Sequence, residues 1–262
     1  MGVGLFDTDL SLNMSTLFIS DLHLSPDQAE LTQVAVDFLA QQAANIDQLY
    51  ILGDLFNTWL GDDIVPDEFQ PLIEQLIKLQ QVGIKSYLMV GNRDFMMGKD
   101  FAARCGLTLL QDPTLIKLGQ HKVLLMHGDS LCIDDVSYQR YRRWSRNRFL
   151  QRCFLMLSAN YRQGISDKIK QKSRQQKQYK SAAIMDVNQS EVSRVMAKYQ
   201  VDYLLHGHTH RPAIHPLGQD QYRVVLGDWQ QQPSFIIFDG YQLQLFDSRI
   251  ADNSDASILT LS

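Results

Sequence analysis

The first half of the chain alternates short apolar runs with longer amphipathic stretches. The apolar runs lie at 16–20, 50–54 and 84–90, and helical patterns of hydrophobic residues occupy 26–43 and 66–82. Short runs that are apolar throughout are typical of strands covered on both faces, and intervening helices allow such strands to run parallel. We therefore expect a βαβαβ unit with a buried, largely parallel sheet.

Later apolar runs predict further strands. After KVLLMHGDS at 122–130, a helix at about 187–199 and a strand at 201–207 return the chain to its core. The runs YRVVLGD, SFIIFDG and QLQLF are expected to form a second sheet. The fold class that follows is α/β, a β-sandwich flanked by helices.

Residues 136–185 interrupt this pattern. Within them, 139–180 hold 13 of the 25 Lys and Arg but a single acid, Asp167, so this stretch carries +12 and the rest of the chain −16. Aromatic and aliphatic residues are interleaved with the arginines. We interpret 136–185 as a basic, amphipathic helical insertion, or lid, in a core made of 14–135 and 186–250. The charge favours a surface for nucleic acid, phospholipid or a phosphorylated substrate, while a solvated helix face is the simpler alternative.

The two ends of the chain are set apart from this core. Residues 1–13 are expected to be an extension and 251–262 a flexible tail. Cys105, Cys132 and Cys153 are odd in number and form no CxxC pair, which fits free thiols in a reducing compartment. No apolar run approaches the roughly 20 residues that span a bilayer. These features favour a cytosolic protein.

Polar residues follow five of the apolar runs. The clusters are Asp21-Leu22-His23, Gly53-Asp54, Gly91-Asn92-Arg93-Asp94, His127-Gly128-Asp129 and Gly207-His208-Thr209-His210. Because the carboxyl ends of parallel strands gather ligands, we expect these clusters in one crevice. Oxygen and nitrogen donors without cysteine suit Mn²⁺, Fe or catalytic Zn²⁺, and the Asn oxygen with two carboxylates favours Mn²⁺. A single strand-end His is usually structural, but five ordered clusters indicate a metal site.

The order DxH, GD, GN, H, GHxH resembles that of the calcineurin-like metallophosphoesterases, over about residues 16–246. The resemblance implies a metallophosphoesterase-type sandwich with two divalent ions that activate water and clamp a phosphate. One ion would be held by Asp21, His23 and His210, the other by Asn92, His127 and His208, and both by Asp54.

Arg93 departs from the family pattern, in which a His commonly follows the motif's Asn and assists the leaving group. An arginine cannot donate a proton usefully at neutral pH, but its planar fork can bind two phosphate oxygens. The substitution therefore favours a leaving group that needs no proton, such as the phosphate released from a pyrophosphate.

A narrower resemblance rests on ISDLHLSPD, YILGDLFNTWLGDD, GNRDFMMG, LMHGDSLCIDD, KSAAIMDVNQ and LLHGHTHRPAIH. Together they resemble the bacterial UDP-2,3-diacylglucosamine pyrophosphatases of lipid A synthesis. The resemblance implies hydrolysis at the α-phosphate to UMP and 2,3-diacylglucosamine 1-phosphate (lipid X), by a peripheral protein on the cytoplasmic side of the inner membrane. The insertion would then shelter acyl chains and meet anionic lipid headgroups. Neither nucleic acid nor a protein partner is expected.

The same resemblance implies roles for individual side chains. Asn92, Arg93 and His208 are expected to act in catalysis. The expected substrate contacts are Asn92, Arg93, Asp135, Ser173, Lys177, Lys180, His208, Trp59 and Tyr138. Lys177 and Lys180 lie in a basic, polar stretch that would be solvated in most proteins, so a surface role stays open for both.

Two other functions stay open at this point. A nucleic-acid phosphodiesterase would use the basic segment to follow a backbone and its aromatic side chains to stack on bases. The aliphatic clusters FLQRCFLML and IMDV suit acyl chains better than bases. A scaffold that has lost the chemistry is the alternative from another class, but all seven expected ligands are present.

Overall fold

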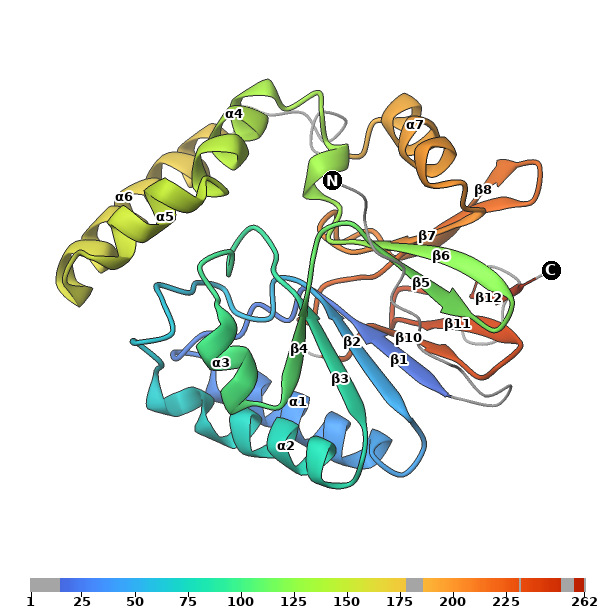
Figure 1. The fold of residues 1–262 in the computed structure, drawn as a ribbon, viewed down its shortest axis with the longest axis horizontal. Coiled ribbons are helices and arrows are strands. Elements are labelled where there is room, and N and C mark those ends of the chain that lie inside the picture. The colour runs from blue at the N-terminus through green and yellow to red at the C-terminus, as the bar shows by residue number, and fades with distance from the viewer. Residues whose placement is uncertain (1–14, 178–185, 231, 251–256, 262) are drawn as a thin grey trace.

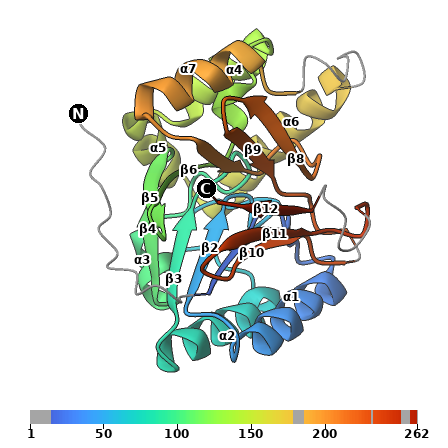
Figure 2. The same cartoon turned by 90° about the vertical axis from the view of Figure 1, so that its right-hand side faces the viewer.

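The computed structural model describes residues 15–177, 186–230, 232–250 and 257–261. Two β-sheets lie face to face between helical layers (Figures 1 and 2). The first sheet has the order β12-β11-β10-β1-β2-β3-β4 and the second β5-β6-β7-β9-β8. The predicted α/β sandwich flanked by helices, with a helical insertion, is confirmed.

The first sheet is built around four parallel strands: β1 (Thr16–Ile19), β2 (Gln48–Leu52), β3 (Lys85–Met89) and β4 (Leu107–Leu110). Every residue of β1 and β2 is buried. Alternate residues serve two interfaces, since Leu17 packs toward the helices and Phe18 toward the second sheet. An apolar run without polar alternation is the sequence consequence of this double coverage.

Three helices and a short 3-10 turn connect these strands: α1 (Ala29–Gln42), η1 (Asp67–Phe69), α2 (Gln70–Gln81) and α3 (Lys99–Arg104). Figure 1 shows α1 and α2 side by side against the outer face of the first sheet. Their apolar faces form one hydrophobic core with that side of the sheet. The crossovers bring the carboxyl ends of β1, β2 and β3 to the same edge.

The second sheet consists of β5 (Thr114–Leu118), β6 (His121–Met126), β7 (Tyr203–His206), β8 (Ala213–Gly218) and β9 (Gln221–Val225). Its strands β6, β7 and β9 are parallel. The helix α7 (Gln189–Tyr199) covers its outer face, and a second hydrophobic core fills the space between the two sheets. The 3-10 turn η2 (Asp129–Leu131) follows β6.

Two strands lie in a different sheet from the one expected. The runs SFIIFDG and QLQLF become β10 (Phe235–Phe238) and β11 (Gln242–Phe246), and β10 pairs antiparallel with β1 in the first sheet. Only YRVVLGD, as β9, joins the second sheet. The local pattern predicts each strand but not its partner, because pairing depends on contacts distant in sequence.

The tail expected at 251–262 also differs from the structure. Within the described part of this segment, β12 (Ile258–Thr260) pairs with β11. Leu259 and Leu261 add to the core between the sheets, which holds this end of the chain against the sandwich.

The predicted insertion contains three helices: α4 (Val136–Ser145), α5 (Arg148–Leu155) and α6 (Ala159–Lys177). They project together from the sandwich (Figure 1). Arg162 of α6 fastens this group to the core, because its buried guanidinium donates to Leu60 O at 2.8 Å and to Asp63 Oδ1 at 2.7 Å. Among the described residues, no helix combines the length and the apolar character needed to cross a membrane.

Candidate metal centre

Three donor side chains from the two sheets meet at one point. Asp21 and His23 follow β1 of the first sheet, and His210 follows β7 of the second. The Nε2 atoms of His23 and His210 are 3.1 Å apart, and Asp21 Oδ1 lies 3.3 Å from His210 Nε2. One ligand atom from each residue lies within 4.8 Å of the others, so the three could hold one cation.

A second group of donors lies beside the first. Asp54 follows β2, His127 follows β6 and His208 follows β7, and their ligand atoms also lie within 4.8 Å of one another. Asn92 extends this group, since its Oδ1 is 2.9 Å from His127 Nε2. The rings of His127 and His208 are 5.1 Å apart. The structure thus brings together all seven side chains that the sequence predicts as ligands.

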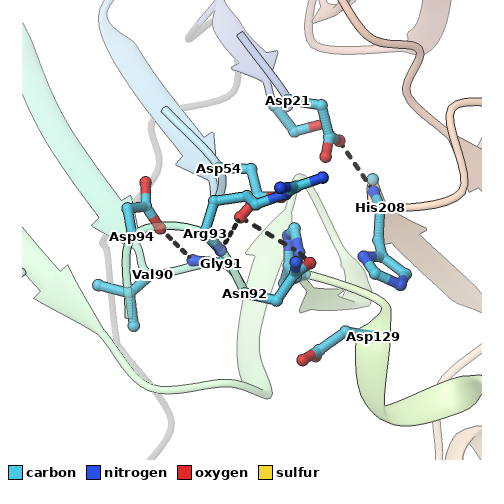
Figure 3. Close-up of polar contacts among 12 residues, drawn as sticks. Asp21, Asp54, Val90, Gly91, Asn92, Arg93, Asp94, Asp129 and His208 are labelled. Carbon is cyan, nitrogen blue, oxygen red and sulfur yellow. Dashed lines mark hydrogen bonds and ion pairs between the residues drawn. The ribbon is translucent and has the colours of Figure 1, made fainter. Parts of the chain in front are cut away.

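Asp54 lies between the two groups. Its Oδ2 is 3.9 Å from Nδ1 of His23, and its Oδ1 is 3.8 Å from Nε2 of His127. Figure 3 shows its carboxylate between Asp21 on one side and Asn92 on the other. A carboxylate in this place can contribute one oxygen to each of two neighbouring cations.

Polar atoms left without partners fit a bound cation. His23 Nδ1 is buried and forms no hydrogen bond to any residue that the structure describes, and the buried Asp21 Oδ1 has only the 3.3 Å approach of His210 Nε2 in place of a well-formed hydrogen bond. Burying polar atoms in this way costs free energy unless another ligand satisfies them. A divalent metal ion satisfies such atoms, and the mixture of carboxylate and imidazole donors suits a transition-metal ion.

His127 provides a second test of the fit. Its Nδ1 lies 2.9 Å from Leu52 O, which can only accept a hydrogen bond, so Nδ1 carries the proton. In the neutral ring Nε2 then carries the lone pair, and it faces Asn92 Oδ1, which is also an acceptor. The 2.9 Å approach is favourable when positive charge lies at Nε2, either as a proton in the metal-free ring or as a cation bound by both atoms. The backbone carbonyl therefore orients His127 as a metal ligand.

The backbone at the site is strained. Asp21, His23, Asp54, His208 and His210 all have positive φ angles, between 51° and 68°. Each such residue costs on the order of 1–3 kcal/mol and persists where the surrounding structure enforces it. The strain reflects the sharp turns that direct these side chains away from the strand ends and toward one another.

Two glycines allow the chain segments to approach closely. A Cβ at position 91 would collide with the carboxylate and backbone of Asp54, and one at position 207 would collide with Asp21 and Ser20. These glycines explain why the sequence reads Gly-Asn and Gly-His in the two clusters, because a larger residue would push the ligand loops apart.

The charges of the site favour a cation. Although burial opposes a charged ring, the carboxylates of Asp54 and Asp21 raise the pKa of His127 to about 9. Burial raises the pKa of Asp54 to about 6, although the His127 charge acts in the opposite direction. By contrast, burial lowers the pKa of His23 to about 4 and that of His208 to about 3. Both rings are therefore neutral at pH 7, with lone pairs available for a metal.

Comparisons with known proteins agree with this geometry. The pattern of the calcineurin-like phosphoesterases matches residues 14–212. The chain is 42% identical over 235 residues to UDP-2,3-diacylglucosamine hydrolase of Proteus mirabilis, an alignment that covers 88% of this chain and 98% of the relative. The chain belongs to the calcineurin-like phosphoesterase family. Membership implies that the protein binds divalent metal, and the two donor groups are its candidate sites.

Further matches include the enzyme of the same name from Photobacterium profundum. It is 43% identical over 239 residues, covering 89% of this chain and 98% of the relative. Among solved structures, a dimetal phosphatase from Danio rerio is 9% identical, covers 88% of this chain and 95% of its own, and has a TM-score of 0.49.

The residues expected to contact substrate have different surroundings in this calcineurin-like phosphoesterase. Arg93 is exposed and extends beside Asp54 (Figure 3). The ring of Tyr138 lies 6.0 Å from that of His208, and Asp135 caps α4 by accepting from Tyr138 N at 3.0 Å. Trp59, however, is only 3% exposed.

Trp59 packs in an aromatic cluster with Phe56 and Phe101, and its Nε1 donates to Asp62 Oδ1 at 2.9 Å. Direct contact with substrate would require this cluster to open. Ser173 and Lys177 belong to helix α6, whereas Lys180 lies outside the described residues.

One residue that sequence reasoning missed is Asp228. It follows β9 and places Oδ2 3.5 Å from Nδ1 of His210, on the side of the ring away from Asp21. Arg249 in turn donates to Asp228 Oδ1 at 2.8 Å. Carboxylates commonly hold the outer nitrogen of a metal-bound His. The Gly-Asp pair at the end of YRVVLGD carried the same signal as the other strand-end clusters.

Proposed function

We propose that this chain hydrolyses the pyrophosphate bond of UDP-2,3-diacylglucosamine, with water attacking the α-phosphate. The products are UMP and 2,3-diacylglucosamine 1-phosphate, an intermediate of lipid A biosynthesis. The observation that carries this proposal is the near full-length identity of 42% to 45% with relatives named UDP-2,3-diacylglucosamine hydrolase. The chain is therefore a hydrolase that acts on a phosphorus-containing anhydride.

We propose that the two donor groups hold two divalent ions. Asp21, His23 and His210 would hold one, Asn92, His127 and His208 the other, and Asp54 both. The neutral amide oxygen of Asn92 and the carboxylates of Asp21 and Asp54, without any sulfur, favour Mn²⁺. When bound, a pair of such ions supplies Lewis acidity that activates water and offsets charge on phosphate oxygens.

Three side chains beside the proposed ions would bind the phosphate. Arg93 would bind phosphate oxygens with its planar guanidinium and so stabilise negative charge in the transition state. It need not donate a proton, since the sugar phosphate leaves as a stabilised anion. Asn92 and His208 fix the phosphate next to Arg93, because each comes from a loop that also shapes the metal centre.

The insertion would hold the glucosamine phosphate. The proposed contacts are Asp135, Ser173, Lys177 and Lys180, with Tyr138 and Trp59 nearby. Tyr138 has the strongest geometric support because its ring lies beside that of His208. The cationic side chains of the insertion complement a phosphorylated sugar.

The exposed face of the insertion supports peripheral attachment to an anionic membrane on the cytoplasmic side of the inner membrane. Most of the large exposed hydrophobic side chains of the described residues lie on or next to α4, α5 and α6. They include Trp144 at 67% and Phe149 at 72% exposure, and both line a groove with Arg140 and Arg143. Apolar side chains among cations are typical of surfaces that lie in the membrane interface.

The test is release of UMP from UDP-2,3-diacylglucosamine in mild detergent, with added Mn²⁺ and with chelator. A nucleic-acid diester serves as the control substrate. Metal-dependent release of UMP without cleavage of the diester supports the proposal. Diester cleavage without UMP would move the assignment to a nucleic-acid phosphodiesterase, and inactivity toward both with metal bound would indicate a scaffold.

A further inference from the structure

The loop that carries Asn92 and Arg93 is held on its inner side by the core. Gly91 N donates to Asp94 Oδ1 at 2.7 Å, and Arg93 N donates to Asp54 Oδ1 at 2.7 Å (Figure 3). Asp94 is fully buried and also accepts from Phe56 N at 3.3 Å. These bonds use the amide hydrogens of Gly91 and Arg93 and leave the carbonyl oxygens of Val90 and Gly91 available to other donors.

Those carbonyl oxygens are bound by the insertion. Arg146, the C-cap residue of α4, donates from its Nη2 to Gly91 O at 2.9 Å and to Val90 O at 3.4 Å. Its guanidinium also lies 5.9 Å from the centre of the Phe95 ring, within reach of a cation–π contact. The loop is therefore held between Asp54 and Asp94 on one side and Arg146 on the other.

The helix that presents Arg146 is itself fixed to the other side of the site. Asp129, two residues after His127, is buried and accepts from Tyr138 Oη at 2.6 Å and from Arg142 Nε at 2.8 Å. The pairing is charge-assisted, which makes these bonds stronger than neutral ones. Through these contacts α4 connects the segment after β6 with the loop after β3.

We infer that Arg146 is a positioning residue for the ion proposed at Asn92 and His127. By fixing the carbonyl oxygens of Val90 and Gly91, Arg146 sets the distance between the loop and His127, and so the place of the Asn92 oxygen. The inference rests on the metal assignment proposed above. It gives the insertion a second role, as part of the framework of the metal centre.

Metal affinity tests this inference without substrate. Binding of Mn²⁺ to the metal-free full-length protein is measured by titration calorimetry for wild type, Arg146→Ala, Arg146→Lys, Arg143→Ala and Asn92→Ala. Arg143 lies on α4, close to Arg146, and is exposed, so Arg143→Ala removes the same charge as Arg146→Ala without removing the contact to the loop. Asn92→Ala reports the loss of the ligand itself.

We expect Arg146→Ala to lower the affinity for one of the two ions by roughly 10-fold or more and to leave the affinity for the other unchanged. The affected ion should be the one whose affinity also falls in Asn92→Ala. Arg143→Ala should bind both ions with wild-type affinity. Arg146→Lys, which can donate to one carbonyl, should lose less. General loosening of the fold would weaken both ions together.

Two results would contradict the inference in distinguishable ways. If Asn92→Ala weakens one ion but Arg146→Ala binds both normally, Arg146 does not position the loop and the metal assignment stands. If Asn92→Ala also binds both normally, the metal assignment itself fails. Should Arg146→Ala not fold, Arg146→Lys decides, because wild-type binding of both ions by that variant overturns the inference.

Discussion

His23 and His210 present their Nε2 atoms to each other at 3.1 Å, although they follow strands of different sheets and lie 187 positions apart in the sequence. Two imidazoles can share one proton across such a contact, whereas a cation can bind the lone pairs of both rings. The close approach of these rings is therefore the clearest geometric support for a metal between the sheets.

The first prediction concerns His210. His210→Ala should leave about one tightly bound ion per chain in place of two, because it removes a donor from only one group. Elemental analysis of the protein after loading with Mn²⁺ and desalting measures this. His215→Ala is the control, since that ring lies outside both donor groups. Two ions retained in His210→Ala would contradict the ligand assignment.

The second prediction concerns Asp54. Asp54→Ala should lower turnover below detection while the protein remains folded, because two close cations need a shared carboxylate. Circular dichroism and UMP release are measured on the same sample. Asp37→Ala removes an exposed carboxylate from α1 and should keep wild-type activity. Turnover at the wild-type rate in Asp54→Ala would exclude a bridging role.

Arg93 is the subject of the third prediction. Arg93→Ala should lower kcat/KM by roughly 10- to 100-fold, which corresponds to loss of charge-assisted hydrogen bonds worth about 1.5–3 kcal/mol. Arg93→Lys should recover little of this, since an ammonium cannot bind two oxygens through a planar fork. Arg104→Ala on α3 controls for the loss of charge. Full activity in Arg93→Ala would mean that Arg93 does not contact the phosphate.

The fourth prediction concerns the exposed face of the insertion. Trp144→Ser combined with Phe149→Ser should reduce sedimentation with vesicles that contain anionic phospholipid, because both side chains are largely exposed and lie among arginines. UMP release in detergent should change little. Tyr241→Ser is a matched control, since Tyr241 is 71% exposed and lies far along the chain beside β11. Equal loss of vesicle binding in both proteins would argue against the insertion as the docking face.

The sequence predicts the chemistry of the site well because that chemistry is local. Asp21, Asp54 and His127 each lie within two residues of the end of a strand. Parallel pairing of β1 with β2 brings the first two together, and the facing of the two sheets adds the third. The same reasoning could have found Asp228 after β9. It could not find Arg249 or Arg146, since neither follows a strand and each reaches the site through tertiary contacts alone.

The arrangement of strands is less accessible to sequence reasoning. The apolar runs at β10 and β11 predict strands, but the pairing of β10 with β1 depends on contacts between residues that lie more than 200 positions apart, and β11 follows by pairing with β10. β12 was missed because three residues give no measurable alternation. Trp59 shows a related difficulty, since an aromatic residue near a ligand loop can belong equally well to the core or to a binding surface.

The most direct test of the proposed reaction is hydrolysis of UDP-2,3-diacylglucosamine in water labelled with ¹⁸O, followed by mass spectrometry of both products. Attack of water on the α-phosphate forms a new bond to that phosphorus and breaks its bond to the bridging oxygen, which leaves with the sugar phosphate. The account predicts one ¹⁸O atom in UMP and none in 2,3-diacylglucosamine 1-phosphate. Label in the lipid product instead would place the attack on the β-phosphate and contradict the proposed mechanism.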